Sequence, residues 1–289
     1  MSYYPIIDKL STQTASDTIW QIISHYHQYG STVVNYLYGA NIIKYQLLED
    51  QQNTYKQALL DGDFLLPDGI ALRTLRVLWR QAGIINGPST ISNLNGTDMI
   101  DKILTHLTAQ GYHIHLSLYC NYDPKLNIQA GELIAGAKTY LATHYNISID
   151  YAVDKLYGGS ETRDRTQYAQ TKSPQSSHEN KQTINIILVC TGTPHQEWRI
   201  AQNRSYIKQH HCLVLAQGWT LDFRSGKEPR APQRLRSLHG EFIYRLIINP
   251  RKNRKKCLIS FMMIWLIVKE QCKDFFSSLL THNKNDNHQ

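Results

Sequence analysis

From Asp17 to about Gly218, helical stretches alternate with short apolar runs along the chain. Such alternation is typical of βα units arranged around a largely parallel sheet. The sequence therefore predicts an α/β fold with a doubly wound, mostly parallel sheet. The predicted strands cover residues 32–37, 63–66, 112–119, 147–151, 184–190 and 212–216. The predicted helices cover residues 17–29, 54–60, 70–81, 98–109, 130–144 and 194–209.

A basic segment follows this alternating region. The chain has a net charge of +8, and eleven Lys or Arg residues lie between Arg224 and Lys256 against two acidic residues. Such a charge suggests an anionic partner, which leaves nucleic acid, anionic lipid and a phosphorylated substrate open. After Pro229 the pattern changes to helices only. We therefore expect an α/β core over residues 1–228 and a basic, amphipathic helical appendage over residues 229–289.

The sequence also carries information about the cellular compartment. The five cysteines are odd in number and never form a CxxC pair, which argues against a disulfide framework and favours reduced thiols. Residues 1–14 lack a basic region followed by an apolar one, so no secretion signal is predicted. The longest apolar run, residues 257–268, is shorter than the roughly 20 residues that a membrane-spanning helix needs. We expect a cytoplasmic protein with a polar surface loop over residues 158–182.

Two motifs follow predicted strands. Asp68 stands in Leu-Leu-Pro-Asp-Gly at the end of one strand, where ligands bind in open α/β sheets, and its carboxylate suits a general base. A simple turn is the alternative, since Pro, Asp and Gly all favour turns. The second motif, residues 191–198, has a Gly turn and Pro194 ahead of a helix, which suits phosphate or nucleotide binding. An ordinary strand-to-helix connection with Trp198 in the core is equally compatible.

Two later motifs add acidic and basic candidates. Asp222 follows the last predicted strand and orients a substrate or serves as a structural cap. An arginine-rich helical stretch comes next, and arginine binds phosphate bidentately, although a solvated basic face is the alternative. Its aliphatic and aromatic residues give it apolar surface to bury against core or lipid. The arginines singled out are Arg230, Arg234, Arg245 and Arg251.

Several signatures of other enzyme classes are missing from the sequence. It contains no GxGxxG, no GxxxxGK[ST] and no GxSxG, which counts against a dinucleotide oxidoreductase, a P-loop enzyme and an α/β-hydrolase. The thirteen histidines form no HExxH pair, and no DxD follows a strand. Neither a metal site nor a cofactor is predicted.

Taken together, the segments PDGIAL, NGTDMI, GTPHQEW, GWTLDF and RAP…R…E…YRL…NPRK resemble, in order and spacing, the WecG/TagA/CpsF family of glycosyltransferases. The resemblance covers about residues 30–255 and implies a Rossmann-like core. It also implies inverting, metal-independent transfer of N-acetylmannosamine or its uronic acid from UDP to an undecaprenyl-diphosphate-linked acceptor. The setting it implies is surface polysaccharide or cell-wall polymer biosynthesis, at the inner face of the cytoplasmic membrane.

The resemblance also assigns roles to particular residues. Asp68 matches the family's proposed catalytic base. Arg230, Arg234, Arg245 and Arg251 fall on the appendage that is thought to bind the lipid diphosphate. The residues expected near the nucleotide sugar are Asn41, Gly69, Gly96, Asp98, Gly192, Gln196, Glu197 and Asp222.

The chain also departs from the family pattern. Asn93 stands where the family usually has an arginine, three residues before Gly96, and Ala40 stands where a threonine is common. The donor is therefore left open among N-acetylmannosaminyl, glucuronosyl, glucosyl and galactosyl nucleotides. A non-catalytic relative that binds membrane or nucleic acid is the rival outside the enzymes, although nucleic acid is not the expected partner. Residues 258–280 are expected to contact the anionic membrane surface, with packing on the core or on a second copy of the chain as the alternative.

Overall fold

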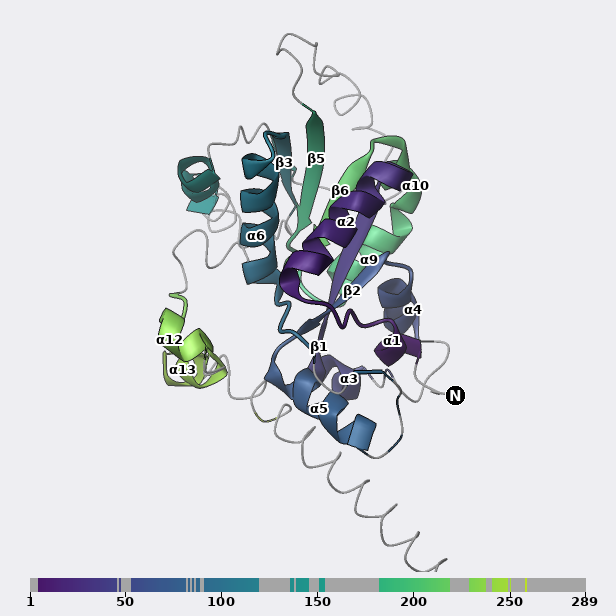
Figure 1. Ribbon diagram of the computed structural model, residues 1–289, viewed down its shortest axis with the longest axis vertical. Helices are drawn as coiled ribbons and strands as arrows, with labels where there is room; N and C mark the ends of the chain where they lie inside the picture. Colours follow the sequence, from purple (N-terminus) through teal and green to yellow (C-terminus); the bar gives the residue numbers. More distant parts are fainter. Residues whose placement is uncertain are drawn as a thin grey trace, which may run out of the picture.

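The computed structural model (Figure 1) is an α/β protein. Its strands are β1 (Thr32–Tyr38), β2 (Phe64–Asp68), β3 (His113–Tyr119), β4 (Tyr151–Val153), β5 (Thr183–Val189) and β6 (Cys212–Ala216). Its helices are α1 (Pro5–Asp8), α2 (Ala15–Tyr29), α3 (Gly39–Lys44), α4 (Thr54–Leu60), α5 (Ile70–Gln81), α6 (Gly96–Ala109), α9 (His195–Gln202), α10 (Arg204–Gln209), α12 (Gln233–Ser237) and α13 (Glu241–Ile248). The structure describes residues 5–45, 47, 53–81, 83, 85, 87–88, 91–119, 136–137, 139–145, 151–153, 182–218, 229–237, 241–248, 250 and 258.

The strands form one six-stranded sheet in the order β2-β1-β6-β5-β3-β4, and every pair is parallel. The predicted α/β fold with a parallel sheet is thereby confirmed. The chain leaves β1 toward β2 at one edge and returns to β6 from the other side. The carboxyl ends of β1 and β6 therefore lie where the winding direction changes, which is where open α/β sheets bind ligands.

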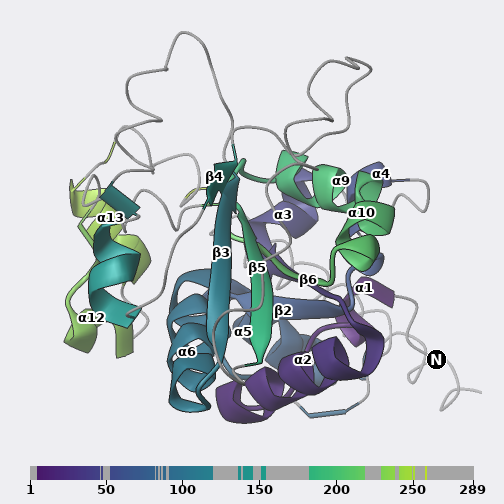
Figure 2. The same cartoon turned by 90° about the horizontal axis from the view of Figure 1, so that it is seen from above.

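Helices cover both faces of the sheet, as Figure 2 shows, with α2 and α6 on one face and α4, α9 and α10 on the other. The alternating side chains of β1 explain this arrangement. Val34 and Tyr36 join the core cluster that contains α2 and α6. Leu37 joins the cluster of α1, α4 and α5, and Asn35 Nδ2 donates to the Ala58 carbonyl of α4 at 3.1 Å. No described helix is long and apolar enough to cross a bilayer.

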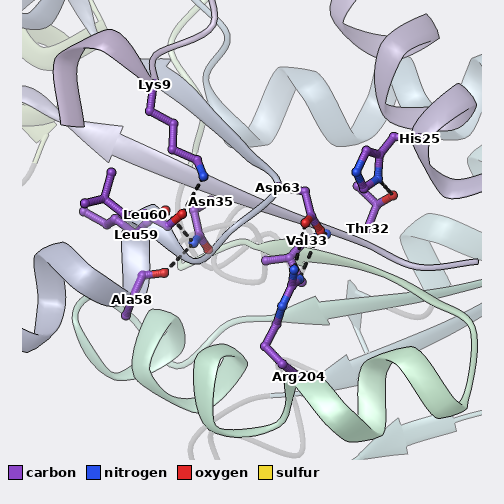
Figure 3. Close-up of polar contacts among 10 residues, drawn as sticks. All are labelled: Lys9, His25, Thr32, Val33, Asn35, Ala58, Leu59, Leu60, Asp63 and Arg204. Atoms are coloured by element: carbon purple, nitrogen blue, oxygen red, sulfur yellow. Dashed lines mark hydrogen bonds and ion pairs between the residues drawn. The ribbon is translucent and has the colours of Figure 1, made fainter. Parts of the chain in front are cut away.

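A polar network fixes the amino ends of β1 and β2 (Figure 3). The Asp63 carboxylate accepts two hydrogen bonds from the Arg204 guanidinium, at 2.7 and 3.0 Å, and one from the Val33 N–H at 2.7 Å. Lys9 Nζ donates to the Leu60 carbonyl at 2.5 Å. An open depression of about 240 Å³ lies here, between Lys9 and Asp63. This network therefore lies at the opposite end of β2 from Asp68.

The structure corrects part of the predicted helix pattern. The helix predicted over residues 194–209 is two helices, because Asn203 interrupts it: its side-chain amide donates to the Arg199 carbonyl at 2.7 Å. Helix α3 was not predicted, and it begins directly after β1 without a connecting loop. The strand predicted at 147–151 meets β4 only at Tyr151, since residues 146–150 lie outside the described part. The loop predicted at 158–182 lies outside it too, except for Gln182.

Candidate active site

The Pro-Asp-Gly turn after β2 carries Asp68. Asp68 is the last residue of β2 and pairs in register with Tyr38 at the end of β1. Gly69 follows with φ +89°, a left-handed conformation that favours glycine. The Gly69 N–H donates to Asn93 Oδ1 at 3.1 Å, and the Leu94 N–H donates to the Pro67 carbonyl at 3.0 Å. The segment at residues 93–94 therefore braces the turn, and Asn93 does so where the family usually has an arginine.

The start of α6 lies against the end of β6. Asn95 caps the helix, accepting a hydrogen bond from the Asp98 N–H at 3.0 Å and donating to the Asp98 carboxylate at 2.7 Å. A Cβ added at Gly96 would lie 3.0 Å from the Gln217 side-chain oxygen. Gln217 is 2% exposed, and its amide also donates to the Tyr36 hydroxyl at 3.2 Å. Gly96 thus allows α6 to approach β6 closely.

Two buried residues at this end of the sheet, Tyr36 and Gln217, were not singled out from the sequence. Burial raises the pKa of the Tyr36 phenol, and the nearby negative charge of Asp68 raises it further. Gln217 connects this phenol to the start of α6, and its own N–H donates to the Val189 carbonyl at 2.7 Å. Its position directly after β6, just before the predicted Gly-Trp-Thr-Leu-Asp motif, was the signal in the sequence that could have identified it.

The third set of residues comes from the connection between β5 and α9. Gly192 has φ +78°, and the Thr193–Pro194 peptide bond is cis. Gln196 and Glu197 open α9 and are 4% and 0% exposed. Burial raises the pKa of Glu197 to about 7, although two side-chain hydrogen bonds and one backbone bond act in the opposite direction. Gln196 and Glu197 therefore form a buried polar junction behind a half-buried turn.

Asn41 meets this junction from the other side. It lies in α3, and its Nδ2 donates to the hydroxyl of the buried Tyr55 in α4 at 3.2 Å. The Tyr45 hydroxyl donates to the Thr193 carbonyl at 3.4 Å. Helices α4 and α9 also pack directly against each other. The folded chain thus brings Asn41 toward the segment that contains Gln196 and Glu197.

Arg230, one of the predicted arginines, lies in the described part of the chain and forms an ion pair. Its guanidinium pairs with the Asp98 carboxylate at 2.7 Å, with both side chains partly exposed. Arg230, which is predicted to bind the lipid diphosphate, is thus held by Asp98, which is predicted to bind the nucleotide sugar. Figures 1 and 2 both place α12 and α13 together on the side of α6. Arg234 is exposed on α12, whereas Asp222, Arg251 and the side chain of Arg245 lie outside the described residues.

The arrangement suits acid–base chemistry on a polar substrate. Asp68 lies at the end of β2, and two glycine turns, a helix N-terminus and buried amides lie at the same carboxyl edge of the parallel sheet. In the described part of the chain, no three His, Cys, Asp or Glu side chains come together as metal ligands do. Nucleotides suit such an edge because helix N-termini and glycine turns present backbone N–H groups.

Comparison with known proteins identifies relatives of the chain. Residues 131–275, half of the chain, match the model of the glycosyl transferase WecG/TagA/CpsF family. Over 206 residues the chain is 26% identical to N-acetylglucosaminyldiphosphoundecaprenol N-acetyl-beta-D-mannosaminyltransferase from Bacillus spizizenii (strain W23). That match covers 71% of this chain and 68% of the relative. The chain belongs to the WecG/TagA/CpsF family and is a glycosyltransferase.

Proposed function

We propose that the protein transfers N-acetylmannosamine, or its uronic acid, from UDP to an undecaprenyl-diphosphate-linked sugar. Membership of the family and the name of the Bacillus relative, which specifies this kind of acceptor and sugar, support the proposal. The observation that carries it is the position of Asp68 at the carboxyl end of β2, on the same edge of the sheet as the turns that follow β5 and β6. The product would enter a surface polysaccharide or a cell-wall polymer.

Asp68 is the proposed base. Its carboxylate takes the proton of the acceptor hydroxyl, and the hydroxyl oxygen bonds to the anomeric carbon on the face opposite UDP. The bond from that carbon to the diphosphate oxygen breaks, and UDP leaves with the electron pair. One displacement of this kind inverts the anomeric configuration. The step as written uses no metal ion, which is a testable part of the proposal.

The nucleotide sugar is proposed to lie across the carboxyl ends of β1, β2, β5 and β6. The backbone turns at Gly69 and Gly192, both with positive φ, and the N-terminus of α6 lie at that edge, and a helix N-terminus suits the diphosphate. Polar side chains then come from α3, α6 and α9. The proposed contacts are Asn41, Gly69, Gly96, Asp98, Gly192, Gln196, Glu197 and Asp222.

Residues 229–289 are proposed to form a basic appendage that binds the lipid diphosphate at the anionic inner face of the cytoplasmic membrane, with residues 1–228 as the catalytic core. The exposed apolar side chains of α13 support this proposal: Ile247 is 72% exposed and Ile248 is 53% exposed. Such side chains suit the boundary between headgroups and acyl chains, and arginines suit the diphosphate. The proposed diphosphate ligands are Arg230, Arg234, Arg245 and Arg251.

The test is acceptor-dependent release of UDP in the presence of EDTA. A panel of UDP-sugars, including the glucuronate, glucose and galactose donors, is supplied with a short-chain lipid-diphosphate-GlcNAc acceptor. Wild type should release UDP with the N-acetylmannosamine donor, and Asp68→Ala should lower kcat at least 100-fold, since base catalysis contributes about 10²–10⁴-fold. Asp61→Ala, an exposed aspartate at the other end of β2, is the matched control and should keep full activity.

Each other outcome identifies a different fault in the proposal. Turnover with another donor only would change the sugar and keep the enzyme. Activity retained by Asp68→Ala would remove the base assignment, and activity lost in EDTA would remove metal independence. No turnover with any donor, together with salt-sensitive binding to anionic vesicles, would leave the non-catalytic membrane-binding relative.

A further inference from the structure

A run of hydrogen-bonded side chains joins α9 to Asn41. Asn41 Nδ2 donates to the Tyr55 hydroxyl at 3.2 Å, and the Thr193 side chain also hydrogen-bonds that hydroxyl. Thr193 Oγ1 donates to Glu197 Oε1 at 3.1 Å. Gln196 Nε2 donates to the same Oε1 at 2.8 Å. Glu197 is therefore the acceptor on which the polar side chains of this junction converge.

The Glu197 carboxylate dictates which way the Gln196 amide points. An amide can turn either its oxygen or its nitrogen toward a neighbour, but the Glu197 oxygen that it meets already acts as an acceptor. The nitrogen of Gln196 must therefore face Glu197, and its Oε1 must face the opposite way. This Oε1 is buried and has no hydrogen-bond partner among the described residues.

The free oxygen of Gln196 faces the junction of two glycines. A Cβ added at Gly218 would lie 3.3 Å from Gln196 Oε1 and 3.5 Å from the Gly192 Cα. Gly218 follows β6 and Gly192 follows β5, so both glycines lie at the ligand-binding edge of the sheet. A buried acceptor without a partner costs about 1–3 kcal/mol. A hydrogen-bond donor supplied by a ligand would remove that cost.

We propose that Glu197 is a positioning residue that fixes the Gln196 amide, so that Gln196 Oε1 accepts a hydrogen bond from an N–H or O–H group of the nucleotide sugar. This inference rests on the proposed function. It changes the role expected for Glu197, which is 0% exposed and acts through Gln196 instead of touching the donor. Through Thr193 and Tyr55, the same carboxylate also supports the orientation of Asn41.

The energetic cost of Glu197 supports a role beyond packing. Burial of a carboxylate is unfavourable, and Glu197 Oε2 has no hydrogen-bond partner among the described residues. Burial raises its pKa to about 7, so a substantial part of the population is charged inside the protein at neutral pH. A glutamine would fill the same volume without a buried charge. The charged form of Glu197 only accepts hydrogen bonds and so orients the Gln196 amide, which a glutamine at position 197 would not do.

The experiment measures nucleotide binding by calorimetry, with UDP and UDP-N-acetylmannosamine as probes. Glu197→Gln should weaken binding of UDP-N-acetylmannosamine about 10-fold, because the new amide can donate and so allows Gln196 to turn over. The double variant Gln196→Glu/Glu197→Gln should return the affinity to within about 3-fold of wild type. In that variant an acceptor oxygen again faces the two glycines, held by a donor from position 197.

Asp63→Asn is the matched control. It makes the same carboxylate-to-amide change in a partly buried polar network at the amino end of the sheet (Figure 3). It should lower stability and leave the affinity for both probes unchanged. Thermal unfolding of every variant, followed by circular dichroism, confirms that each is folded at the temperature of the titration.

Three results would overturn the inference. Glu197→Gln could bind within 2-fold of wild type, Asp63→Asn could weaken binding as much as Glu197→Gln does, or the double variant could fail to recover. Release of UDP is measured separately and reports on the proposed function. A wild type that turns over while Glu197→Gln binds normally contradicts only the role of Glu197. A wild type that binds neither probe contradicts both.

Discussion

Replacing Asp63 with asparagine is expected to lower the free energy of unfolding by about 2–3 kcal/mol at neutral pH. The carboxylate receives two hydrogen bonds from Arg204 and one from the Val33 N–H. An asparagine has one acceptor oxygen, and its NH₂ group would face donors. Hydrogen bonds to charged groups contribute about 1.5–3 kcal/mol each, and breaking a fully buried pair costs about 3–5 kcal/mol. Solvent reduces these values, because Arg204 and Asp63 are 28% and 18% exposed.

Urea unfolding at pH 7 measures this loss, and thermal unfolding should show a midpoint roughly 4–10 °C lower. Asp61→Asn is the control. The Asp61 carboxylate is exposed and accepts one hydrogen bond from Gln57, so this variant should lower the free energy of unfolding by less than about 0.5 kcal/mol. Arg204→Met and the double variant complete a cycle whose coupling energy isolates the pair. A loss below about 0.5 kcal/mol for Asp63→Asn, or no coupling with Arg204, would refute the reasoning.

The same variant has a predicted pH dependence. Burial alone would raise the pKa of Asp63, but the hydrogen bonds from Arg204 and Val33 and the positive charge of Arg204 outweigh it and hold the pKa below 3.8. A lowered pKa gives stability that is present above the unfolded-state value and is lost as the pH falls through the folded-state value. The difference in stability between wild type and Asp63→Asn should therefore stay constant from about pH 8 to 5 and narrow below about pH 4.

Three further predictions concern the carboxyl edge of the sheet. Glu197→Gln should be more stable than wild type above pH 7, because a pKa raised from 4.5 to about 7 makes wild type lose stability as the pH rises through 7. At about 1.4 kcal/mol per pKa unit, the gain is at most roughly 3 kcal/mol. Urea unfolding of both proteins at pH 5 and pH 8.5 tests this, and a difference in unfolding free energy that is the same at both pH values contradicts it. Asp98→Asn and Arg230→Gln should each raise the KM for the lipid acceptor several-fold. The KM of the double variant should be no higher than that of either single variant, because the two residues share one ion pair. Additive effects on KM would show that the two residues act separately. Gly96→Ala should destabilise the protein by about 1–3 kcal/mol, since its Cβ would meet the Gln217 amide at 3.0 Å, and Gln217→Ala in the same chain should recover part of that loss in thermal unfolding.

Elements with strong local signals were predicted closely. Residues 54–60 and 70–81 are helical with the predicted bounds, and α4 has the expected side-chain cap from Asn53. The predicted start of α6 was two residues late, because Asn95 caps the helix ahead of Gly96. Local residue patterns and turn chemistry thus determined much of the fold.

The contacts that build the candidate site were harder to predict. Asp98 and Arg230 are 132 residues apart in sequence, so no local pattern links them. The family resemblance predicts Glu197 near the nucleotide sugar, but it does not predict that Glu197 is 0% exposed, a burial that depends on the packing of α9 against α4 and other distant parts of the chain. The break between α9 and α10 at Asn203 depends on one side-chain amide that hydrogen-bonds the backbone. The spacing of apolar residues in the sequence does not reveal such a contact.

The position of β1 between β2 and β6 has a consequence for synthesis of the chain on the ribosome. Thr32 pairs with Leu213, so one edge of β1 stays unpaired until about 180 further residues have been synthesised and β6 can form. At a synthesis rate of about 5–20 residues per second, this edge is unpaired for roughly 10–35 s. An apolar strand with an open edge is a template for pairing with other chains, and this interval is when a chaperone would be most useful. A fragment that ends before residue 212 should accumulate as aggregates, whatever the stability of the complete fold.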